Sequence, residues 1–564
     1  MRAHTPEPPP SQAMPERYPP SHRSIWYVIA ALFVGLCLFL VLDKDSFLHG
    51  MIYKDIPFSW DNVFVSLKAY GYWLFTIYLI STGLALFFEN RNPDRTVAWL
   101  LVLALLPFVG LVLYWLVGPN FRYLADKRRF RLPKPRSVAP HNVCVADFTP
   151  MMTDTAMLMY RTSGARLLNA GLSPLPLYDG AATFAHIKDR LRRAENYILL
   201  ESYIIKNDAT GNAIKDILIE RAQAGVFVCM VYDAVGSWKI GKGYLEALRT
   251  DGVHTRAFLP VAFPMFRGAN YRNHRKIIVV DGDTAYLGGM NIGDEYAGLD
   301  PHLTSWRDAH LELGGEAVAA LHAIFVNDLA ACCRDTALVE RVRCLPVNTG
   351  AVNTGAVNTG AVNPGAEAEV SEPQDDTVCT ASVPVQIIAS GPDTPWDTIH
   401  KAYLSLISRS RKTLWMTTPY LVPGDALMEA ICMASLSGVD VRMMLPGKSD
   451  HPIVQWASMN CCDELLRSGV RIFLYDAKGF IHAKTIVCDG ALLSVGSANL
   501  DTRSLQINFE VQAFLYDKTL AAEAERVFEA DMANSRELTF MSWRQRPKIE
   551  RVKESVGKLF SSLL

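Results

Sequence analysis

Residues 274–281 read His-Arg-Lys-Ile-Ile-Val-Val-Asp, and residues 482–489 read His-Ala-Lys-Thr-Ile-Val-Cys-Asp. After six intervening residues, the Asp of each stretch is followed by a small-residue turn that ends in Asn, at 288–291 and 496–499. From average composition, one His-x-Lys-x4-Asp pattern is expected about a few hundredths of a time in a chain of this length. Two copies with the same downstream spacing therefore indicate an internal duplication, and this duplication decides the fold.

The residue types of the repeated motif suit chemistry on a phosphodiester. The β-branched runs predict strands, and strand periodicity would place each His and its Lys on one face. Lys supplies positive charge to phosphate oxygens, Asn adds hydrogen-bond donors, and glycine lets backbone approach a ligand. Histidine, with an unperturbed pKa of about 6.5, can attack phosphorus or exchange protons near neutral pH. Two copies would supply both roles; the alternative is a pair of buried structural histidines.

The chain around each motif has the rhythm of an α/β fold. In the first half, strand-like stretches at 197–203 and 226–231 flank a helical stretch. The second half repeats this order, with strand-like stretches at 413–420 and 439–445. Such alternation predicts a pair of similar α/β domains.

We place the two halves at residues 150–345 and 383–545, with a linker at 346–382 between them. The linker contains a near-perfect Val-Asn-Thr-Gly-Ala repeat from Val347 to Ala366. Asn, Gly and small residues cannot bury a core, so this segment is predicted to be flexible. A solenoid is the alternative, but four units of five residues are too few to stabilise one.

Three apolar runs precede the two halves. After a Pro-rich leader at 1–23, predicted to be disordered, the uncharged run at 24–42 is just long enough to cross a bilayer. Two further runs within 70–117 are separated by a short polar turn and predict a transmembrane helical hairpin. Buried core helices are the alternative, and Pro107 could turn the last run into a re-entrant segment.

The distribution of Lys and Arg predicts the orientation of these spans. Seven Lys and Arg residues lie between positions 122 and 136, whereas the turn before the last run contains only Arg91 and Arg95. The large C-terminal part is therefore expected on the cytoplasmic side of a multi-pass membrane protein. The run at 24–42 could instead be a signal-peptide core, but no small-residue cleavage pattern follows it.

Composition excludes some classes of function. Lys+Arg 56 against Asp+Glu 57 gives a formal charge of -1, which does not favour a nucleic-acid partner. The 11 cysteines include no pair spaced against His as in zinc sites, so no metal site is predicted. Their irregular spacing fits a reducing compartment better than a secreted disulfide framework.

The C-terminal segment 546–564 is predicted to be an amphipathic tail. Its apolar residues recur at helical spacing from Ile549 to Leu563, with Arg551, Lys553 and Lys558 among them. This pattern is typical of an interfacial helix on an anionic leaflet, and equally of a helix docked on the protein.

These motifs resemble those of the phospholipase D superfamily, and their surroundings resemble its cardiolipin synthase branch. The resemblance covers the chain from about residue 70 to the C-terminus. The matching stretches are Glu-Asn-Arg at 89–91, Ala-Trp-Leu at 98–100, Tyr-Arg-Asn-His-Arg-Lys at 271–276, Trp-Arg-Asp at 306–308, Phe-Ile-His-Ala-Lys at 480–484, Asn-Leu-Asp-Thr-Arg-Ser at 499–504 and Asn-Phe-Glu at 508–510. It implies duplicated α/β/α sandwich domains behind N-terminal transmembrane helices.

The resemblance also implies a mechanism and a set of site residues. One histidine would attack a phosphatidyl phosphorus to form a phosphohistidine, while the other handles the alcohol protons, without metal or other cofactor. We favour His274 as nucleophile and His482 as acid/base. The expected catalytic residues are His274, Lys276, Asp281, His482, Lys484 and Asp489, the expected substrate-binding residues are Gly289, Asn291, Ser497 and Asn499, and the expected supporting residues are Asp308 and Glu510.

The function implied is transfer of a phosphatidyl group between two phosphatidylglycerol molecules, with the membrane and anionic phospholipids as partners. A hydrolytic membrane phospholipase D is the near alternative, because water differs from an alcohol only as acceptor. A nuclease would need a basic groove with interleaved aromatic residues, which neither motif region shows. A catalytically inactive scaffold would be expected to lack a motif residue, and none is missing. The sequence leaves open the phosphatidyl donor, the identity of the nucleophile and the oligomeric state.

Overall fold

The computed structural model describes most of the chain from Phe148 onward and a small part before it. The described residues are 80, 83, 93–106, 109–110, 114, 148–171, 174–260, 270–301, 305–348, 382–394, 396–475 and 479–560. The chain divides into two compact units, Met1–Tyr123 and Leu124–Leu564, each of which is described by itself.

The N-terminal unit contains helix α4 (Pro93–Leu105) within the stretch predicted as a transmembrane hairpin. Its apolar side chains are largely exposed, Leu105 among them. Among the described residues, no helix combines the length and the apolar character that crossing a membrane requires. The segments 1–23 and 24–42 and most of 70–117 lie outside the described residues, so the structure leaves the predictions for them untested.

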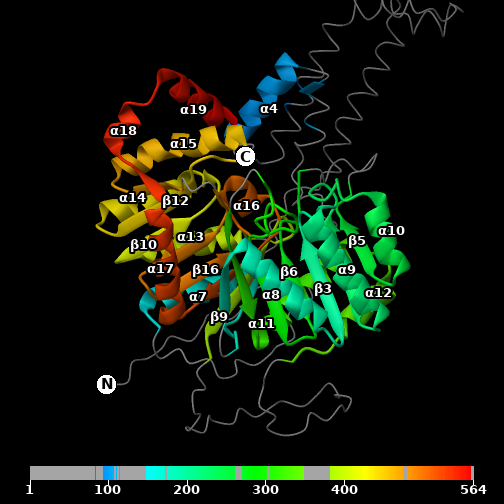
Figure 1. Ribbon diagram of the computed structural model, residues 1–564. Helices are drawn as coiled ribbons and strands as arrows, with labels where there is room; N and C mark the ends of the chain where they lie inside the picture. Colours follow the sequence, from blue (N-terminus) through cyan, green and yellow to red (C-terminus); the bar gives the residue numbers. More distant parts are fainter. Residues whose placement is uncertain are drawn as a thin grey trace, which may run out of the picture. The chain divides into compact units, whose positions relative to one another are not determined.

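The first motif lies in a mixed sheet of eight strands (Figure 1). The order is β14-β8-β7-β6-β3-β4-β5, with β2 paired to β8. Strands β3, β4 and β5 are parallel to one another, and β14 is parallel to β8. The pairs β3–β6, β6–β7, β7–β8 and β2–β8 are antiparallel. The strands are β2 (Leu175–Asp179), β3 (Tyr197–Ser202), β4 (Phe227–Asp233), β5 (His254–Phe258), β6 (Ile277–Val280), β7 (Thr284–Gly288), β8 (Trp306–Leu313) and β14 (Phe480–Ile481).

Helices cover both faces of this sheet. One face packs against α8 (Gly180–Arg192), α9 (Ala209–Gln223) and α10 (Lys242–Thr250) in a single apolar cluster. Helix α11 (Glu316–Cys332), followed by α12 (Thr336–Arg343), contacts the sheet at β3, β5, β6 and β7. Because neither face meets water, β3 and β4 are buried along their whole length and read as continuous apolar runs.

The second motif lies in a mixed sheet of nine strands, in the order β1-β9-β18-β16-β15-β10-β12-β13-β19. The strands are β1 (Leu168–Asn169), β9 (Pro384–Ser390), β10 (Thr413–Thr417), β12 (Asp440–Pro446), β13 (Arg471–Tyr475), β15 (Thr485–Cys488), β16 (Leu492–Gly496), β18 (Glu510–Leu515) and β19 (Ser535–Leu538). A separate two-stranded ribbon pairs β11 (Leu421–Val422) with β17 (Leu500–Asp501). The helices are α7 (Pro150–Ser163), α13 (Thr398–Arg409), α14 (Asp425–Leu436), α15 (Pro452–Arg467), α16 (Thr502–Gln506), α17 (Lys518–Ala533), α18 (Phe540–Arg544) and α19 (Lys548–Phe560).

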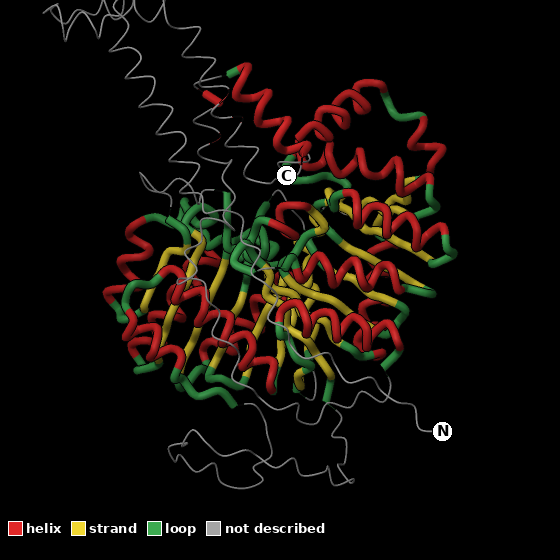
Figure 2. Tube along the Cα trace, turned by 180° about the vertical axis from the view of Figure 1, so that it is seen from behind, coloured by secondary structure: helices red, strands yellow, loops and turns green. Residues whose placement is uncertain are grey.

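The strand order confirms the duplication. The run β8-β7-β6-β3-β4-β5 of the first sheet corresponds to β18-β16-β15-β10-β12-β13 of the second. The strands predicted at 197–203, 226–231, 413–420 and 439–445 are β3, β4, β10 and β12. Both sheets lie between layers of helices when the molecule is seen from either side (Figures 1 and 2). The fold is thus α/β with two similar mixed sheets.

The predicted start of the first half at residue 150 is wrong. Helix α7 packs against α13, and Met151, Met152 and Met159 join the apolar core of the second half. Strand β1 then pairs with β9 at the edge of the second sheet. The segment that contains α7 and β1 therefore packs on the second half, where its apolar side chains are buried, and the chain enters the first half at β2.

The structure describes only the two ends of the linker. Tyr197 Oη donates a 2.9 Å hydrogen bond to Pro346 O, and Asn348 N donates one of 2.8 Å to Gly282 O. On the other side, Ala170 N donates to Val383 O at 3.0 Å. The pentapeptide repeat after Asn348 lies outside the described residues.

Candidate active site

Each histidine motif is held by backbone of the opposite half. His274 N donates to Phe509 O at 2.9 Å, and Phe509 N donates to Arg272 O at 2.9 Å. In the same way, His482 N donates to Arg307 O at 2.7 Å, and β14, just before His482, pairs with β8 of the first sheet. These crossed connections bring the two motifs into one site and make each half a support for the other's histidine.

The carboxylates are crossed as well. His274 Nδ1 lies 3.0 Å from Glu510 Oε2, and His482 Nδ1 lies 2.8 Å from Asp308 Oδ2. Both carboxylates are fully buried and act as acceptors, so each Nδ1 is assigned the proton. This tautomer leaves each Nε2 lone pair for chemistry, and it means that neither half contains a complete histidine–carboxylate pair.

The two carboxylates are fixed by further hydrogen bonds. Trp306 Nε1 and Ala309 N donate to Asp308 at 3.2 and 2.7 Å. Burial alone would raise the pKa of Asp308, but Lys484 and His482 outweigh burial and lower it to about 2. Burial also opposes ionisation of Glu510, yet the neighbouring His274 and Lys276 hold its pKa below the usual value. Both side chains therefore remain negative at neutral pH.

Gly289 and Ser497, which the sequence predicted to bind substrate, instead contact these carboxylates. A Cβ at Gly289 would lie 2.1 Å from Asp308 Oδ1, so only glycine leaves room for that carboxylate. At the equivalent position of the second half, the Ser497 hydroxyl donates to Glu510 Oε2. The small-residue turns thus position the partners of the histidines.

The two lysines lie beside the histidines, although not on the strands. His274 and Lys276 precede β6, and His482 and Lys484 precede β15, so the expected strand periodicity does not place them. Lys276 Nζ instead donates to His274 O at 2.7 Å. Lys484 Nζ donates to His482 O at 2.5 Å and lies 3.0 Å from His482 Nε2. Each lysine thus donates to the backbone of the histidine in its own motif.

Burial tunes the charge of these groups. It lowers the pKa of Lys276 to about 7 and that of Lys484 to about 8. Burial, reinforced by Lys484, lowers the pKa of His482 to about 4, and burial also lowers the pKa of His274. Both rings are therefore neutral at pH 7 in the empty site, and a phosphate anion would favour the charged form of each lysine.

The two asparagines differ in their surroundings. Asn291 Oδ1 accepts a 3.1 Å hydrogen bond from Ile204 N, so this side chain holds a loop. Asn499 Oδ1 is buried and has no hydrogen-bond partner among the described residues. Of the two, Asn499 is therefore the one with unused hydrogen-bonding capacity at the site.

Asp281 and Asp489, expected to be catalytic, are not brought to the histidines. Each follows the four-residue strand that separates it from its motif's Lys, in the left-handed region at φ 54° and 53°. Asp281 accepts backbone N–H groups of residues 195–197, and Asp489 accepts those of residues 411–413, at 2.7 to 3.2 Å. They tie a hairpin turn to the start of β3 or β10, which is a structural position.

We expect Asp281→Ala to lower stability rather than chemistry. Loss of several charge-assisted hydrogen bonds should reduce the free energy of unfolding by about 2–4 kcal/mol. The turnover number of the molecules that remain folded should stay close to the parent value. Asp281→Asn is the matched control, because Asn tolerates the left-handed conformation and still offers an oxygen. Thermal unfolding and turnover at low temperature check this; a loss of turnover without loss of stability would contradict it.

Comparison with known proteins places this site in a family. A family model described as cardiolipin synthase, PLD-like domain, matches residues 187–304 and 403–532, and one described as phospholipase D-nuclease N-terminal matches 72–119. A cardiolipin synthase of Alkalihalophilus pseudofirmus is 37% identical over 503 residues, which are 87% of this chain and 93% of that protein. The chain belongs to the cardiolipin synthase family.

Other relatives agree with this assignment. The major cardiolipin synthase of Bacillus subtilis is 34% identical over 504 residues, covering 87% of this chain and 98% of that protein. The crystal structure of a phosphatidylserine synthase from Haemophilus influenzae has a TM-score of 0.53 at 15% identity, over 73% of this chain and 97% of that one. That structure supports the fold alone. As a member of the cardiolipin synthase family, the chain is a phosphatidyltransferase of the phospholipase D superfamily.

The structure of this cardiolipin synthase family member adds site residues that the sequence had not singled out. Arg275, between His274 and Lys276, donates to Asp328 at 2.5 Å and to Glu510 O at 3.1 Å, and so ties α11 to β18. Rings of Tyr203 and Trp306 lie 5.0 and 5.2 Å from the rings of His274 and His482. The place of Arg275 inside the motif was the one available signal. For Tyr203 and Trp306 the sequence gives no such signal, because an aromatic residue near the end of a strand can equally line a site or pack in the apolar core.

Proposed function

We propose that this enzyme condenses two phosphatidylglycerol molecules into cardiolipin and glycerol through a phosphohistidine. The crossed histidine–carboxylate pairs carry the proposal, because they present two neutral Nε2 atoms from opposite halves to one site. In the first step a nitrogen of one histidine bonds to phosphorus as the phosphorus–oxygen bond to glycerol breaks, and glycerol leaves with a proton delivered through the other histidine. In the second, that other histidine takes the proton from the hydroxyl of another phosphatidylglycerol, the hydroxyl oxygen bonds to phosphorus, and the nitrogen–phosphorus bond breaks.

The unequal contacts of the two lysines support distinct roles for the histidines. The Lys484 ammonium lies 2.7 Å from Nδ1 and 3.0 Å from Nε2 of His482, and of these two nitrogens, with Nδ1–H directed at Asp308, it can donate only to the Nε2 lone pair. That contact places a proton source at the nitrogen that must protonate a leaving alkoxide. Among the described residues, Glu510 is the one side chain hydrogen-bonded to the His274 ring. We therefore assign His274 as nucleophile and His482 as acid/base.

Lys276, Lys484 and Asn499 are the groups that we assign to the phosphate. The two ammonium groups are buried, and a buried charge acts strongly on an anion in a site of low dielectric. Asn499 adds amide N–H donors from the turn that also positions Glu510. Together these donors would stabilise the charge that develops on the non-bridging oxygens at phosphorus.

Exchange of labelled glycerol tests the proposed reaction. One phosphodiester is exchanged for another, so the reaction should run backwards when glycerol is in excess. Purified enzyme incubated with cardiolipin, labelled glycerol and EDTA should place label in phosphatidylglycerol. If phosphatidic acid is the only product, water is the acceptor and the hydrolase alternative holds; if EDTA stops turnover, the metal-free course fails.

We further propose that the enzyme works at the bacterial inner membrane, with the catalytic part on the cytoplasmic side. In this proposal, helix α19 provides a surface that contacts the membrane. Its inner side lies on α15, where a Cβ at Gly557 would come within 2.5 Å of Ala457 N, and where Glu554 is buried and paired with Arg546 at 2.8 Å. The helix is thus docked on the protein through this side.

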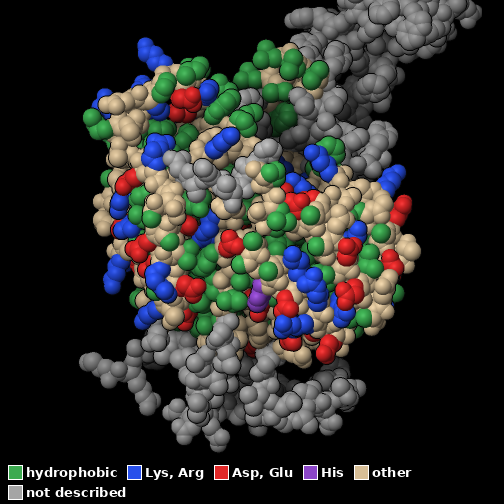
Figure 3. Space-filling model, in the orientation of Figure 1, with side chains coloured by type: hydrophobic (Ala, Val, Ile, Leu, Met, Phe, Trp, Pro, Cys, Tyr) green, Lys and Arg blue, Asp and Glu red, His purple; other side chains and the backbone are tan. Residues whose placement is uncertain are grey.

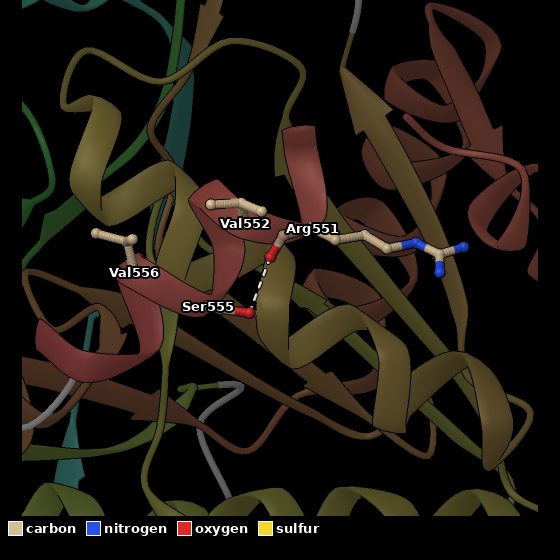
Figure 4. Close-up of a pocket in the computed structure, with 4 residues that line it drawn as sticks. All are labelled: Arg551, Val552, Ser555 and Val556. Carbon is tan, nitrogen blue, oxygen red and sulfur yellow. Dashed lines mark hydrogen bonds between the residues drawn. The ribbon is translucent and has the colours of Figure 1, made fainter. Parts of the chain in front are cut away.

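The outer side of α19 is apolar and basic. Ile549 and Val552 are 60% and 58% exposed. Val552 and Val556 project from the helix beside the extended Arg551 side chain and line a shallow groove with Ser555 (Figure 4). Hydrophobic and basic side chains, with acidic ones among them, lie around α18 and α19 on the face in Figure 3. This composition suits contact with an anionic leaflet.

Replacing Ile549 and Val552 by Glu should lower activity on phosphatidylglycerol vesicles several-fold, while activity in detergent micelles is kept. The physical reason is that two carboxylates cannot enter the acyl boundary and are repelled by anionic lipid. Leu436→Glu, at an exposed apolar residue at the end of α14, is the matched control. Equal losses in vesicles and micelles would show that protein rather than lipid covers this side of α19.

A further inference from the structure

The two histidines of this duplicated site have unlike neighbours. A tyrosine follows the central strand of each half, Tyr203 after β3 and Tyr420 after β10. Each ring contacts a histidine edge to face: Tyr203 and His274 have ring centroids 5.0 Å apart, and Tyr420 and His482 6.3 Å apart. The two tyrosines therefore occupy similar places in the wall of the site, and a difference between their surroundings distinguishes its two sides.

The side of Tyr203 is basic. Lys276 Nζ lies 5.4 Å from the centre of its ring. Burial, with Asp233 and Glu510, raises the pKa of the Tyr203 hydroxyl, and the cations Arg503 and Arg272 oppose this rise. The guanidinium of Arg503 is held by Asn270, with hydrogen bonds of 2.8 Å to Oδ1 and 2.6 Å to the backbone O. The cationic side chains of Lys276 and Arg503 would attract the phosphate group of a lipid.

The side of Tyr420 is acidic. Tyr420 Oη donates to Asp450, at 2.9 Å from Oδ1 and 2.8 Å from Oδ2, and Ser449 Oγ donates to Asp450 at 3.1 Å. The Asp450 side chain is 43% exposed, so its carboxylate has lone pairs open to solvent beyond those that Tyr420 and Ser449 use. His451 Nε2 lies 3.7 Å from Oδ2 and is itself exposed. A carboxylate here repels phosphate and accepts hydrogen bonds from hydroxyl groups.

We propose that Asp450 and Tyr420 form the subsite for the glycerol headgroup on the His482 side, accepting its free hydroxyl while the reacting hydroxyl reaches His482. The inference rests on the proposed function and deepens it, because it names the group that selects a polyol over water or a simple alcohol. Aromatic rings of Tyr420 and Trp306 flank His482 and offer apolar faces to the carbon chain of glycerol. The same subsite would hold glycerol as it leaves and the acceptor headgroup as it enters.

Competition between two alcohols tests the subsite. The full-length enzyme in detergent micelles receives cardiolipin with equal concentrations of glycerol and 1-propanol, which lacks the second and third hydroxyls. We expect the parent enzyme to prefer glycerol, and Asp450→Asn to lower the glycerol-to-propanol product ratio by about tenfold or more, as for loss of a charge-assisted hydrogen bond. Formation of the propanol product should change by less than about threefold, because the variant leaves both histidine pairs intact.

Two further variants make the test specific. Tyr420→Phe keeps the ring beside His482 but removes the donor to Asp450, and should lower the same ratio to a smaller extent. Asp283→Asn is the matched control, since Asp283 is 48% exposed, carries one ion pair with Arg190 and follows the structural turn at Asp281. It should leave the ratio unchanged.

The outcomes separate the subsite from the reaction itself. An unchanged ratio in Asp450→Asn, or an equal fall of both products, would overturn the subsite while leaving the transfer reaction standing. If the parent enzyme forms phosphatidic acid alone from cardiolipin, with neither alcohol incorporated, the proposed function fails and the subsite fails with it.

Discussion

We expect His274→Ala and His482→Ala each to lower cardiolipin formation by at least about 10⁴-fold, because each removes a complete step of the reaction. Without His274 there is no nitrogen to accept the phosphatidyl group. Without His482 the alkoxide leaves unprotonated and the acceptor hydroxyl keeps its proton. Formation of labelled cardiolipin from phosphatidylglycerol in detergent micelles measures both effects.

The fold should survive both substitutions. Each ring makes one hydrogen bond to a carboxylate of the other half, whereas the crossed backbone pairing at His274 N and His482 N does not depend on the side chain. His254→Ala is the control, since His254 lies on β5 against Phe227 and outside the site. Near-normal cardiolipin formation by either histidine variant, with His254→Ala also active, would end the two-histidine account.

Asp308→Asn and Glu510→Gln should each lower turnover by about 10²–10⁴-fold, as removal of the carboxylate that orients a catalytic histidine does elsewhere. An amide can donate to Nδ1 and so stabilise the wrong tautomer, which puts the proton on Nε2. The crossed arrangement gives each variant a distinct signature. Asp308→Asn, on the first half, should impair proton transfer at His482 of the second, and Glu510→Gln should impair attack by His274.

Rapid-quench experiments can separate these two signatures. With phosphatidylglycerol alone, Glu510→Gln should show slow release of the first glycerol. Asp308→Asn should slow both release and consumption of the intermediate. Glu312→Gln is the matched control, because Glu312 lies on the same strand as Asp308 but pairs with His186. Turnover of either carboxylate variant equal to that of Glu312→Gln would contradict the orienting role.

The sequence predicted the central chemistry because the motif is local. His274 and Lys276 lie two residues apart, as do His482 and Lys484, and the duplication predicts two copies of one reactive motif. The strands of both sheets were equally readable, since strands such as β3 are buried on both faces and begin with a run of apolar residues, Tyr197 to Leu200. The local sequence pattern was therefore enough to predict the main strands of both halves and to single out the two histidines.

What the sequence could not show is which partners lie across the interface. Asp308 and Glu510 were expected to orient the histidines, but the exchange of partners between halves depends on how β14 and the segment before β18 pair. Asp281 was misassigned for a related reason. Its place in a motif does not reveal that it ends a strand, turns left-handed and bonds to backbone 84 to 86 residues away.

The C-terminal tail docks on the protein through one side, and its contact with lipid stays a prediction. A glycine weakens a helix, yet the missing side chain of Gly557 permits the close approach of α19 to α15. Ile549 and Val552, on the opposite side, remain exposed. Hydrophobic spacing alone could not assign these sides, because the described part of the contact with α15 uses the small residue Gly557 and lies beside the buried Glu554, which pairs with Arg546.

The most direct test of the composite two-histidine site is to locate the covalent intermediate. Enzyme mixed with phosphatidylglycerol, quenched in denaturant near neutral pH to spare both the acid-labile nitrogen–phosphorus bond and the alkali-labile acyl esters, and then digested, can be mapped by mass spectrometry. The account predicts one phosphatidyl adduct, on the peptide that contains His274, with none in His274→Ala and a changed lifetime in Asp308→Asn. An adduct on His482, or turnover with no adduct on either histidine, would contradict it.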